Sequence, residues 1–305
     1  ASDGQLHPDE IDSVNRVCPN IKMVTNNHLE GGVEPAYLTA IGTTLYFRAY
    51  DRTHGVELWK SDGTASGTLM VKDLMHHNNQ GVQSADAGYH YTDFQDPYFT
   101  AIGSTIFFRA GTNYYDAVHA HDFVDNGTEL WKTDGTANGT IVVKDINIGS
   151  GSSNPTYLTA VGNSLYFSAD DGTNGTELWK SDGTANGTMM LKDINNGSGG
   201  STPQKFIKHG NTLYFVAYDT TNGYSLWKSD GTTNGTIIVK DINDRNDNFN
   251  PFEFVKAYGN TLYFSAFDGT NGYELWRSDG TANGTMLVKD IYNGTGNGYF
   301  GGLTA

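Results

Sequence analysis

The side chains of this sequence that could do chemistry are mostly asparagines and aspartates in glycine-rich segments. Asn-x-Ser/Thr sequons, which accept N-linked glycans on exposed turns of secreted proteins, occur at Asn126, Asn138, Asn174, Asn186, Asn196, Asn234, Asn283 and Asn293. Several of them read Asn-Gly-Thr, and Asn-Gly is also the preferred pair of a tight hairpin turn. The sequons therefore predict exposed turns, with glycosylation as an additional function of the same residues.

Aspartates in similar segments offer the hard oxygen ligands that calcium requires. The candidate ligands are Asp171, Asp219 and Asp268, which stand in segments such as Asp-Gly-Thr-Asn. Their spacing matches neither an EF-hand loop nor a nonapeptide calcium repeat, and aspartate in such turns also binds its own backbone. These aspartate segments do not require a cofactor. Calcium is a possible ligand of them.

Histidines and nucleophiles give weaker patterns. His119 and His121 lie near Asp116 and Asp122, but a zinc or copper site needs three or four converging ligands, and a solvated loop is the alternative. The sequence contains no Gly-x-Ser-x-Gly, no His-Glu-x-x-His and no P-loop motif. We therefore predict that the chain is not an enzyme.

The charge balance restricts the partners. The chain has 19 Lys and Arg against 34 Asp and Glu, for a net charge of −15. Nucleic acids and anionic membranes attract basic patches, so neither is an expected partner. No apolar run approaches the ~18–20 residues of a membrane-spanning helix, and we predict no membrane insertion.

These side chains must be positioned by an internal repeat. The five tryptophans stand at intervals of 72, 48, 48 and 49 residues, at Trp59, Trp131, Trp179, Trp227 and Trp276. Around them the sequence repeats over about 37–75, 98–147, 157–195, 205–243 and 254–292. The long first interval contains two insertions, at roughly 76–96 and 112–125.

Each repeat predicts four short strands. In the third copy these are 157–161, 164–169, a strand with Glu-Leu-Trp-Lys, and 189–191, joined by glycine-rich turns. The Lys-Asp pair that ends the fourth strand predicts solvated or cross-repeat ion pairs. A four-stranded unit repeated every ~40–50 residues is typical of a β-propeller, whose blades bury their faces on one another. A β-solenoid or a string of small β domains is the alternative.

The fold class is therefore all-β, a β-propeller of four-stranded blades. It is either five-bladed or six-bladed, the sixth blade being completed by the terminal strands. Residues 1–20 form an N-terminal arm, and 21–305 form one propeller domain. Residues 21–26 align with a fourth strand and 299–305 with a first strand, and unpaired strand edges seek partners. The predicted assembly residues are Cys18, which is the single cysteine, and Ile21, Met23, Val24, Phe300 and Leu303.

The repeated Glu-Leu-Trp-x-x-Asp-Gly-Thr resembles the motif of the ELWxxDGT repeat family of secreted, mostly bacterial proteins. The resemblance covers about residues 37–292, with Ser225 in place of glutamate in the fourth copy and Thr133 in place of serine in the second. It implies a propeller-like fold and an extracellular or cell-surface location, and it supplies no catalytic residue.

Together these patterns predict a non-catalytic, extracellular structural or adhesive protein. It would be the subunit of a homopolymeric filament or surface layer, with its own copies as partners. The alternative is a carbohydrate-binding, lectin-like propeller with glycans as partners. A third hypothesis is a hydrolase that uses the loops at 76–96 and 112–125.

Overall fold

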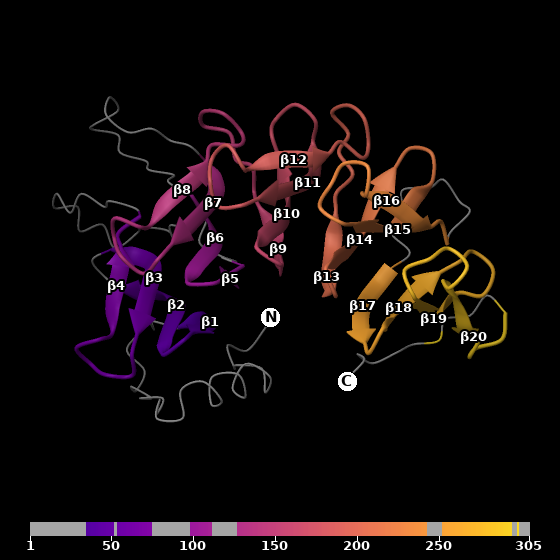
Figure 1. The fold of residues 1–305 in the computed structure, drawn as a ribbon, viewed down its shortest axis with the longest axis horizontal. Helices are drawn as coiled ribbons and strands as arrows, with labels where there is room; N and C mark the ends of the chain where they lie inside the picture. Colours follow the sequence, from indigo (N-terminus) through magenta and orange to yellow (C-terminus); the bar gives the residue numbers. More distant parts are fainter. Residues whose placement is uncertain are drawn as a thin grey trace, which may run out of the picture. The chain divides into compact units, whose positions relative to one another are not determined.

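A computed structural model describes residues 35–51, 54–74, 98–111, 127–242, 252–294 and 298. These residues form twenty strands in five four-stranded antiparallel sheets (Figure 1). Across the same residues, no helix is long and apolar enough to cross a membrane. The chain divides into two compact units, Ala1–Ser153 and Asn154–Ala305.

The first unit contains two sheets, each with its strands in chain order. Blade one consists of β1 (Ala36–Ile41), β2 (Thr44–Asp51), β3 (Gly55–Ser61) and β4 (Leu69–Lys72). Blade two consists of β5 (Thr100–Ile102), β6 (Thr105–Gly111), β7 (Thr128–Thr133) and β8 (Ile141–Lys144).

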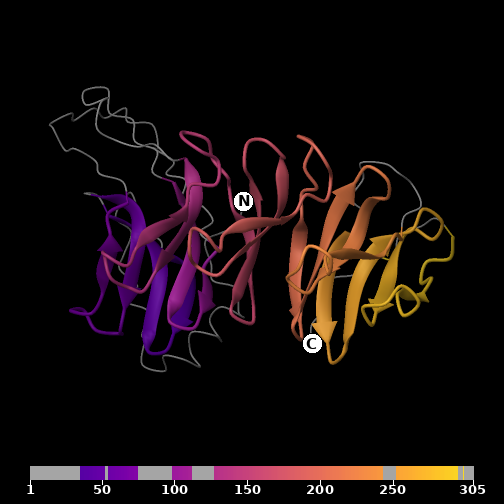
Figure 2. The same cartoon turned by 45° about the horizontal axis from the view of Figure 1, so that its top comes forward.

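The second unit contains three sheets of the same kind. Blade three consists of β9 (Thr156–Val161), β10 (Ser164–Asp170), β11 (Thr176–Ser181) and β12 (Met189–Lys192). Blade four consists of β13 (Gln204–His209), β14 (Thr212–Asp219), β15 (Gly223–Ser229) and β16 (Ile237–Lys240). Blade five consists of β17 (Phe252–Tyr258), β18 (Thr261–Phe267), β19 (Tyr273–Ser278) and β20 (Met286–Lys289). Within this unit β13 lies beside both β9 and β17, so the first strands of its blades are neighbours (Figure 2). We call the first strand of each blade its inner strand.

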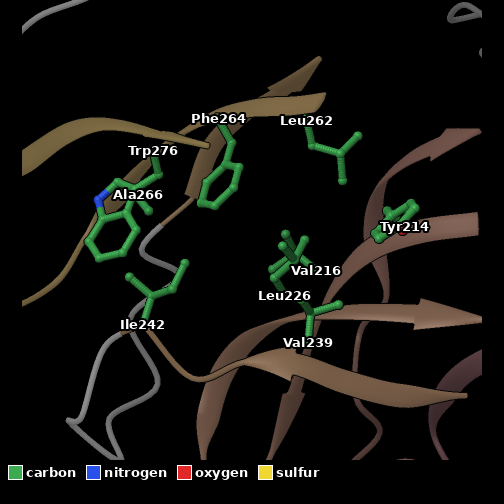
Figure 3. Packing of buried hydrophobic residues seen from close by; sticks show 9 residues of the cluster. All are labelled: Tyr214, Val216, Leu226, Val239, Ile242, Leu262, Phe264, Ala266 and Trp276. Carbon is green, nitrogen blue, oxygen red and sulfur yellow. The ribbon is translucent and has the colours of Figure 1, made fainter. Parts of the chain in front are cut away.

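The core lies between successive sheets. Figure 3 shows blade four facing blade five: Val216, Leu226 and Val239 of one sheet meet Phe264 and Trp276 of the other. Within each unit, facing sheets cover one another in this way, which explains why the central strands are nearly continuous apolar runs. The side of a blade that meets the following blade is here its trailing face, and the opposite side is its leading face. The chain therefore has the β-propeller fold, with four-stranded blades as predicted.

The repeated lysines connect successive blades. Lys228 Nζ donates to the carbonyl oxygen of Gly280 in the next blade over 2.9 Å, and Lys240 Nζ donates to that of Thr285 over 2.8 Å. The same pair of bonds joins blade three to blade four and blade one to blade two. Lys240 belongs to the Lys-Asp pair of its repeat, and its printed bond goes to a backbone carbonyl of the next blade. Ion pairing of the Lys-Asp residues stays a prediction.

The Asp-Gly-Thr segment is a closed turn between the third and fourth strands. Asp230 Oδ1 accepts the backbone N–H and the hydroxyl of Thr232, whose Oγ1 in turn accepts the N–H of Gly235. These donors hold the pKa of the Asp230 carboxyl below its usual value. The aspartate of the motif therefore stabilises its own turn.

The predicted strands of the third copy agree with β9, β10 and β12 to within a residue at each end. Residues 1–20 lie outside the described residues. The arm and the single domain over 21–305 stay predictions.

Candidate functional site

The sequons lie where the turn prediction places them. Exposed positions are taken by Asn138, Asn186, Asn196, Asn234, Asn283 and Asn293. Asn174 is half-buried and binds Asp171, and Asn126 lies outside the described residues. Glycosylation of these asparagines stays a prediction.

The three candidate calcium ligands lie in separate turns that follow the second strands. Asp171 Oδ1 accepts the N–H groups of Thr173 and Asn174, and Asp219 and Asp268 make the equivalent bonds. No three His, Cys, Asp or Glu side chains converge on a possible metal position in the segments that the structure describes. Calcium stays a prediction, on carboxylates that already have local donors.

The assembly residues lie outside the described residues: Cys18, Ile21, Met23, Val24, Phe300 and Leu303. The same holds for His119 and His121 and for the two insertions. The structure therefore does not test whether these side chains lie close together.

The inner strands carry a feature that the sequence analysis missed. Near their starts, Tyr37, Tyr98, Tyr157 and Lys205 have φ angles of 57°, 49°, 56° and 57°. This left-handed conformation costs a non-glycine residue about 1–2 kcal/mol. Such strain persists mostly at ligand-binding and switch positions. Four equivalent positions in four blades share it, which makes the inner strands the candidate site.

A β-bulge explains the conformation. In blade three, Thr156 pairs with Ser168 and Thr159 with Tyr166, so the inner strand has one extra residue between the pairs. Blades one and four show the same shift. The bulge turns Tyr157 toward solvent, at 38% exposed, while the next residue, Leu158, is buried. Bulges commonly redirect side chains at binding sites.

Threonine hydroxyls hold the bulged tyrosines. Thr159 Oγ1 donates to the carbonyl oxygen of Tyr157 over 2.8 Å, and Thr100 Oγ1 donates to that of Tyr98 over 3.2 Å. The ring of Tyr157 also stacks on Phe206 at a centroid distance of 5.8 Å. The backbone of both tyrosines is therefore fixed by a local hydrogen bond, and the ring of Tyr157 is also fixed by Phe206.

Two arginines lie on the second strands of the first unit. The guanidinium of Arg109 lies 5.7 Å from the ring centroid of Tyr98, in a cation–π arrangement. Its Nε is buried and has no hydrogen-bond partner. Arg48 holds the equivalent position in blade one, and its Nε is also buried without a partner. A planar guanidinium is suited to a carboxylate, which can accept from its two terminal nitrogens.

Basic residues gather on these strands although the chain is acidic. Apart from the ten positions at which the repeat places Lys or Arg, the described residues contain five basic side chains, and each lies on a first or second strand: Arg48, Arg109, Lys205, Lys208 and Lys256. Blades one, two, four and five therefore each carry at least one basic residue on a first or second strand.

Buried glutamates position the inner strands. Glu177 is fully buried and accepts hydrogen bonds from the N–H of Ile194, from the N–H of Asn195 and from the hydroxyl of Ser201. Ser201 lies three residues before β13, so this carboxyl anchors the approach to Lys205. Glu129 binds Ser153 in the same way. Burial raises the pKa of both glutamates, although these hydrogen bonds oppose the shift.

This raised pKa predicts a pH-dependent stability. A carboxyl whose pKa rises on folding contributes stability below its unfolded value, about 4.5, and loses it as the pH rises through the folded value. Glutamine cannot ionise. As the pH rises from about 4 to about 8, urea unfolding should therefore show the free energy of unfolding of the Glu177→Gln variant increasing relative to that of the unmodified chain.

The contrasting variant is Asp230→Asn. The pKa of Asp230 is lowered, so its contribution is present above its unfolded value, about 3.8, and is lost as the pH falls. The difference from the unmodified chain should therefore change with pH in the opposite direction. A constant difference for Glu177→Gln over the whole range would contradict the assignment.

Comparisons with known proteins bear on the fold. Neither a protein-family model nor a curated protein matches the chain. Similar solved structures include puromycin hydrolase, with a TM-score of 0.49 and 15% identity over 86% of this chain and 38% of that one. Another is the β-propeller domain of the Trilobed protease from Pyrococcus furiosus, with a TM-score of 0.44 and 9% identity over 85% and 70% of the two chains. Prolyl endopeptidases give 0.48 and 12% over 83% and 35%.

These neighbours correct one prediction. They are peptidases with propeller domains, and on this finding the expected structural or adhesive filament subunit, with its lectin-like alternative, is wrong. At these identities the likeness shows the fold alone, and the chain spans well under two thirds of puromycin hydrolase. The resemblance to the ELWxxDGT family, the extracellular location and the absence of enzymatic activity stay predictions.

Proposed function

We propose that this chain is a polypeptide-binding module whose inner strands receive an extended segment that carries carboxylate groups. The observation that supports this most directly is the Tyr98–Arg109 pair, in which a half-buried guanidinium lies against a half-buried aromatic ring. A carboxylate can bind such a group through two parallel hydrogen bonds, and these are among the stronger ones in proteins. The proposal concerns binding and assigns no catalytic residue.

The position of the inner strands supports an extended polypeptide as the ligand. Each inner strand is the terminal strand of its sheet and pairs on one side only. A further strand can add to the edge of a terminal strand, as in β-strand addition. The bulged tyrosines then supply rigid aromatic anchors beside that edge.

The charge distribution supports acidic side chains in the ligand. The net charge of −15 repels an acidic peptide at long range, but ~0.15 M salt screens charges beyond about 8 Å. At contact, the peptide meets the basic residues of the first and second strands. We therefore expect the acidic peptide to bind more weakly at low salt, where the long-range repulsion is not screened. At either salt concentration, a peptide with carboxylates should bind more tightly than one with amides.

Peptide binding tests the proposal. The probe is a fluorescent peptide of about eight residues that alternates alanine and glutamate, and the reference peptide has glutamine in place of glutamate. We expect the acidic peptide to bind more tightly, and Arg109→Gln or Tyr98→Ala to weaken it about tenfold, as the loss of a charge-assisted bond does. Fluorescence anisotropy measures both.

Arg277→Gln is the matched control, because Arg277 is an exposed basic residue on β19, away from the inner strands. This variant should bind the acidic peptide as the unmodified chain does. Equal binding of the two peptides, or an equal loss with Arg277→Gln, would show that no specific carboxylate site exists on the inner strands.

A further inference from the structure

The trailing face of blade five is exposed, unlike that of the other blades. Val288 on β20 is 47% exposed, whereas Val239 at the same position of blade four is 4% exposed. Ile291 is 54% exposed, whereas Ile242 is 7% exposed. An apolar surface that is buried elsewhere in the repeat is therefore open here.

Within each unit, the following blade covers this surface. Val239 and Ile242 pack on Phe264 and Trp276 of blade five (Figure 3), and Leu191 and its neighbours pack on blade four in the same way. Within the first unit, blade two covers the equivalent residues of blade one. The repeat thus uses this surface for one purpose, the stacking of the next blade.

The polar groups of the exposed face are those that bind a following blade. Arg277 and Lys289 stand at the positions of Lys228 and Lys240, and both are exposed. Tyr263 stands at the position of Tyr214, which contacts Gly280 in the next blade, but Tyr263 is only half-buried. Blade five therefore presents both the apolar and the hydrogen-bonding parts of a blade contact.

We infer that the trailing face of blade five is a docking surface for one further blade of the same repeat. The occupant must offer an apolar Leu-x-Phe-x-Ala row against Val288 and Ile291. It must also offer a turn of the Asp-Gly-Thr type, whose glycine carbonyl accepts from Arg277 and whose last threonine carbonyl accepts from Lys289. The glycine leaves room for the side chain of Tyr263.

The residues after blade five match those that lead into the inner strand of a further blade. Gly298 is buried, and its N–H donates to the carbonyl oxygen of Tyr273 over 2.9 Å. Ser201 makes the equivalent bond to Thr176, also over 2.9 Å, just before β13 begins. The sequence 302–305 reads Gly-Leu-Thr-Ala, which matches Tyr-Leu-Thr-Ala at 157–160. Gly298 thus makes the backbone bond that precedes an inner strand in blade four, and the sequence at 302–305 is of the inner-strand type.

An extended chain tests the inference. A copy of residues 161–196 is joined after Ala305, which continues the repeat in register. Hydrogen exchange is then followed at the amides of 286–292 in the extended and the unextended chain. We expect the extension to slow this exchange about tenfold or more, because the added blade must dissociate before these amides exchange. Val288→Asp should remove the protection in the extended chain and leave the exchange of the unextended chain nearly unchanged.

The control extension has valine in place of the glycine that copies Gly183, so that its turn cannot pack on Tyr263. Exchange that is unchanged by the extension, or slowed equally by the control, would overturn the inference. Self-association of the unextended chain that Val288→Asp abolishes would assign the face to a second copy, and would also overturn it.

Discussion

The Glu177→Ala variant is expected to lose about 3 kcal/mol of unfolding free energy. The substitution removes a fully buried carboxyl that accepts three hydrogen bonds, and it leaves the N–H of Ile194, the N–H of Asn195 and the hydroxyl of Ser201 without their acceptor. Each buried group left in this way costs about 1–3 kcal/mol. Urea unfolding followed by tryptophan fluorescence measures the loss.

Blade four offers the matched control, because Ser225 occupies the same position there. Its hydroxyl is fully buried and has no hydrogen-bond partner. Ser225→Ala removes an unsatisfied polar group, so we expect a change within about 1 kcal/mol, and in the stabilising direction. Similar losses of unfolding free energy for the two variants would show that the Glu177 carboxyl does not anchor the segment between β12 and β13.

The Gly231→Ala variant is expected to destabilise the chain by about 3 kcal/mol. Gly231 has a φ of +90°, and an added Cβ would overlap the hydroxyl of Tyr166 in the preceding blade and lie 3.0 Å from Lys180 Nζ. The left-handed conformation accounts for about 1–2 kcal/mol and the overlap for the remainder. Thermal and urea unfolding measure the combined effect.

Two further variants separate these causes. Gly210 has a φ of +60° and nothing within 4 Å of an added Cβ, so Gly210→Ala should cost about 1–2 kcal/mol, the conformational part alone. Tyr166→Phe removes the overlapping hydroxyl, and the ring carbon that carried it lies 3.6 Å from the added Cβ. The phenylalanine should therefore partly rescue Gly231→Ala. Without any rescue, the blade contact would not be the cause.

The strands could be predicted because the sequence repeats them five times. Alternating residues such as those of 164–169, ended by glycine turns, define a strand in any copy, and the other copies repeat the pattern. The contact between blades was also predictable in outline, since a sheet with two apolar faces must be covered on both. The bonds of Lys228 and Lys240 to carbonyl oxygens could not be predicted, because every residue has a backbone carbonyl and the sequence does not mark which one accepts.

The candidate site could not be predicted for a related reason. Tyrosine and lysine have no preference for the left-handed region, so nothing in Tyr157 or Lys205 indicates their positive φ. The conformation arises from the bulge, which depends on pairing with the second strand. Glu177 is the glutamate of the repeated motif and could be recognised in the sequence. Its hydrogen-bond donors lie 17 to 24 residues later, in the segment between blades three and four, and could not be predicted. The tyrosine that follows a proline in three of the copies was the one signal available.

The lysine bonds between blades give the repeat a polarity. Each blade has its donors, such as Lys228 and Lys240, on one side and its glycine and threonine carbonyl acceptors on the other. A unit built in this way needs no change in its own residues to accept a neighbour, so duplication or loss of one 48-residue segment preserves each remaining contact. The number of blades can therefore change by single genetic steps while the chemistry of each contact stays the same, and the inner strand of each new copy adds one more bulged position at which specificity can diverge.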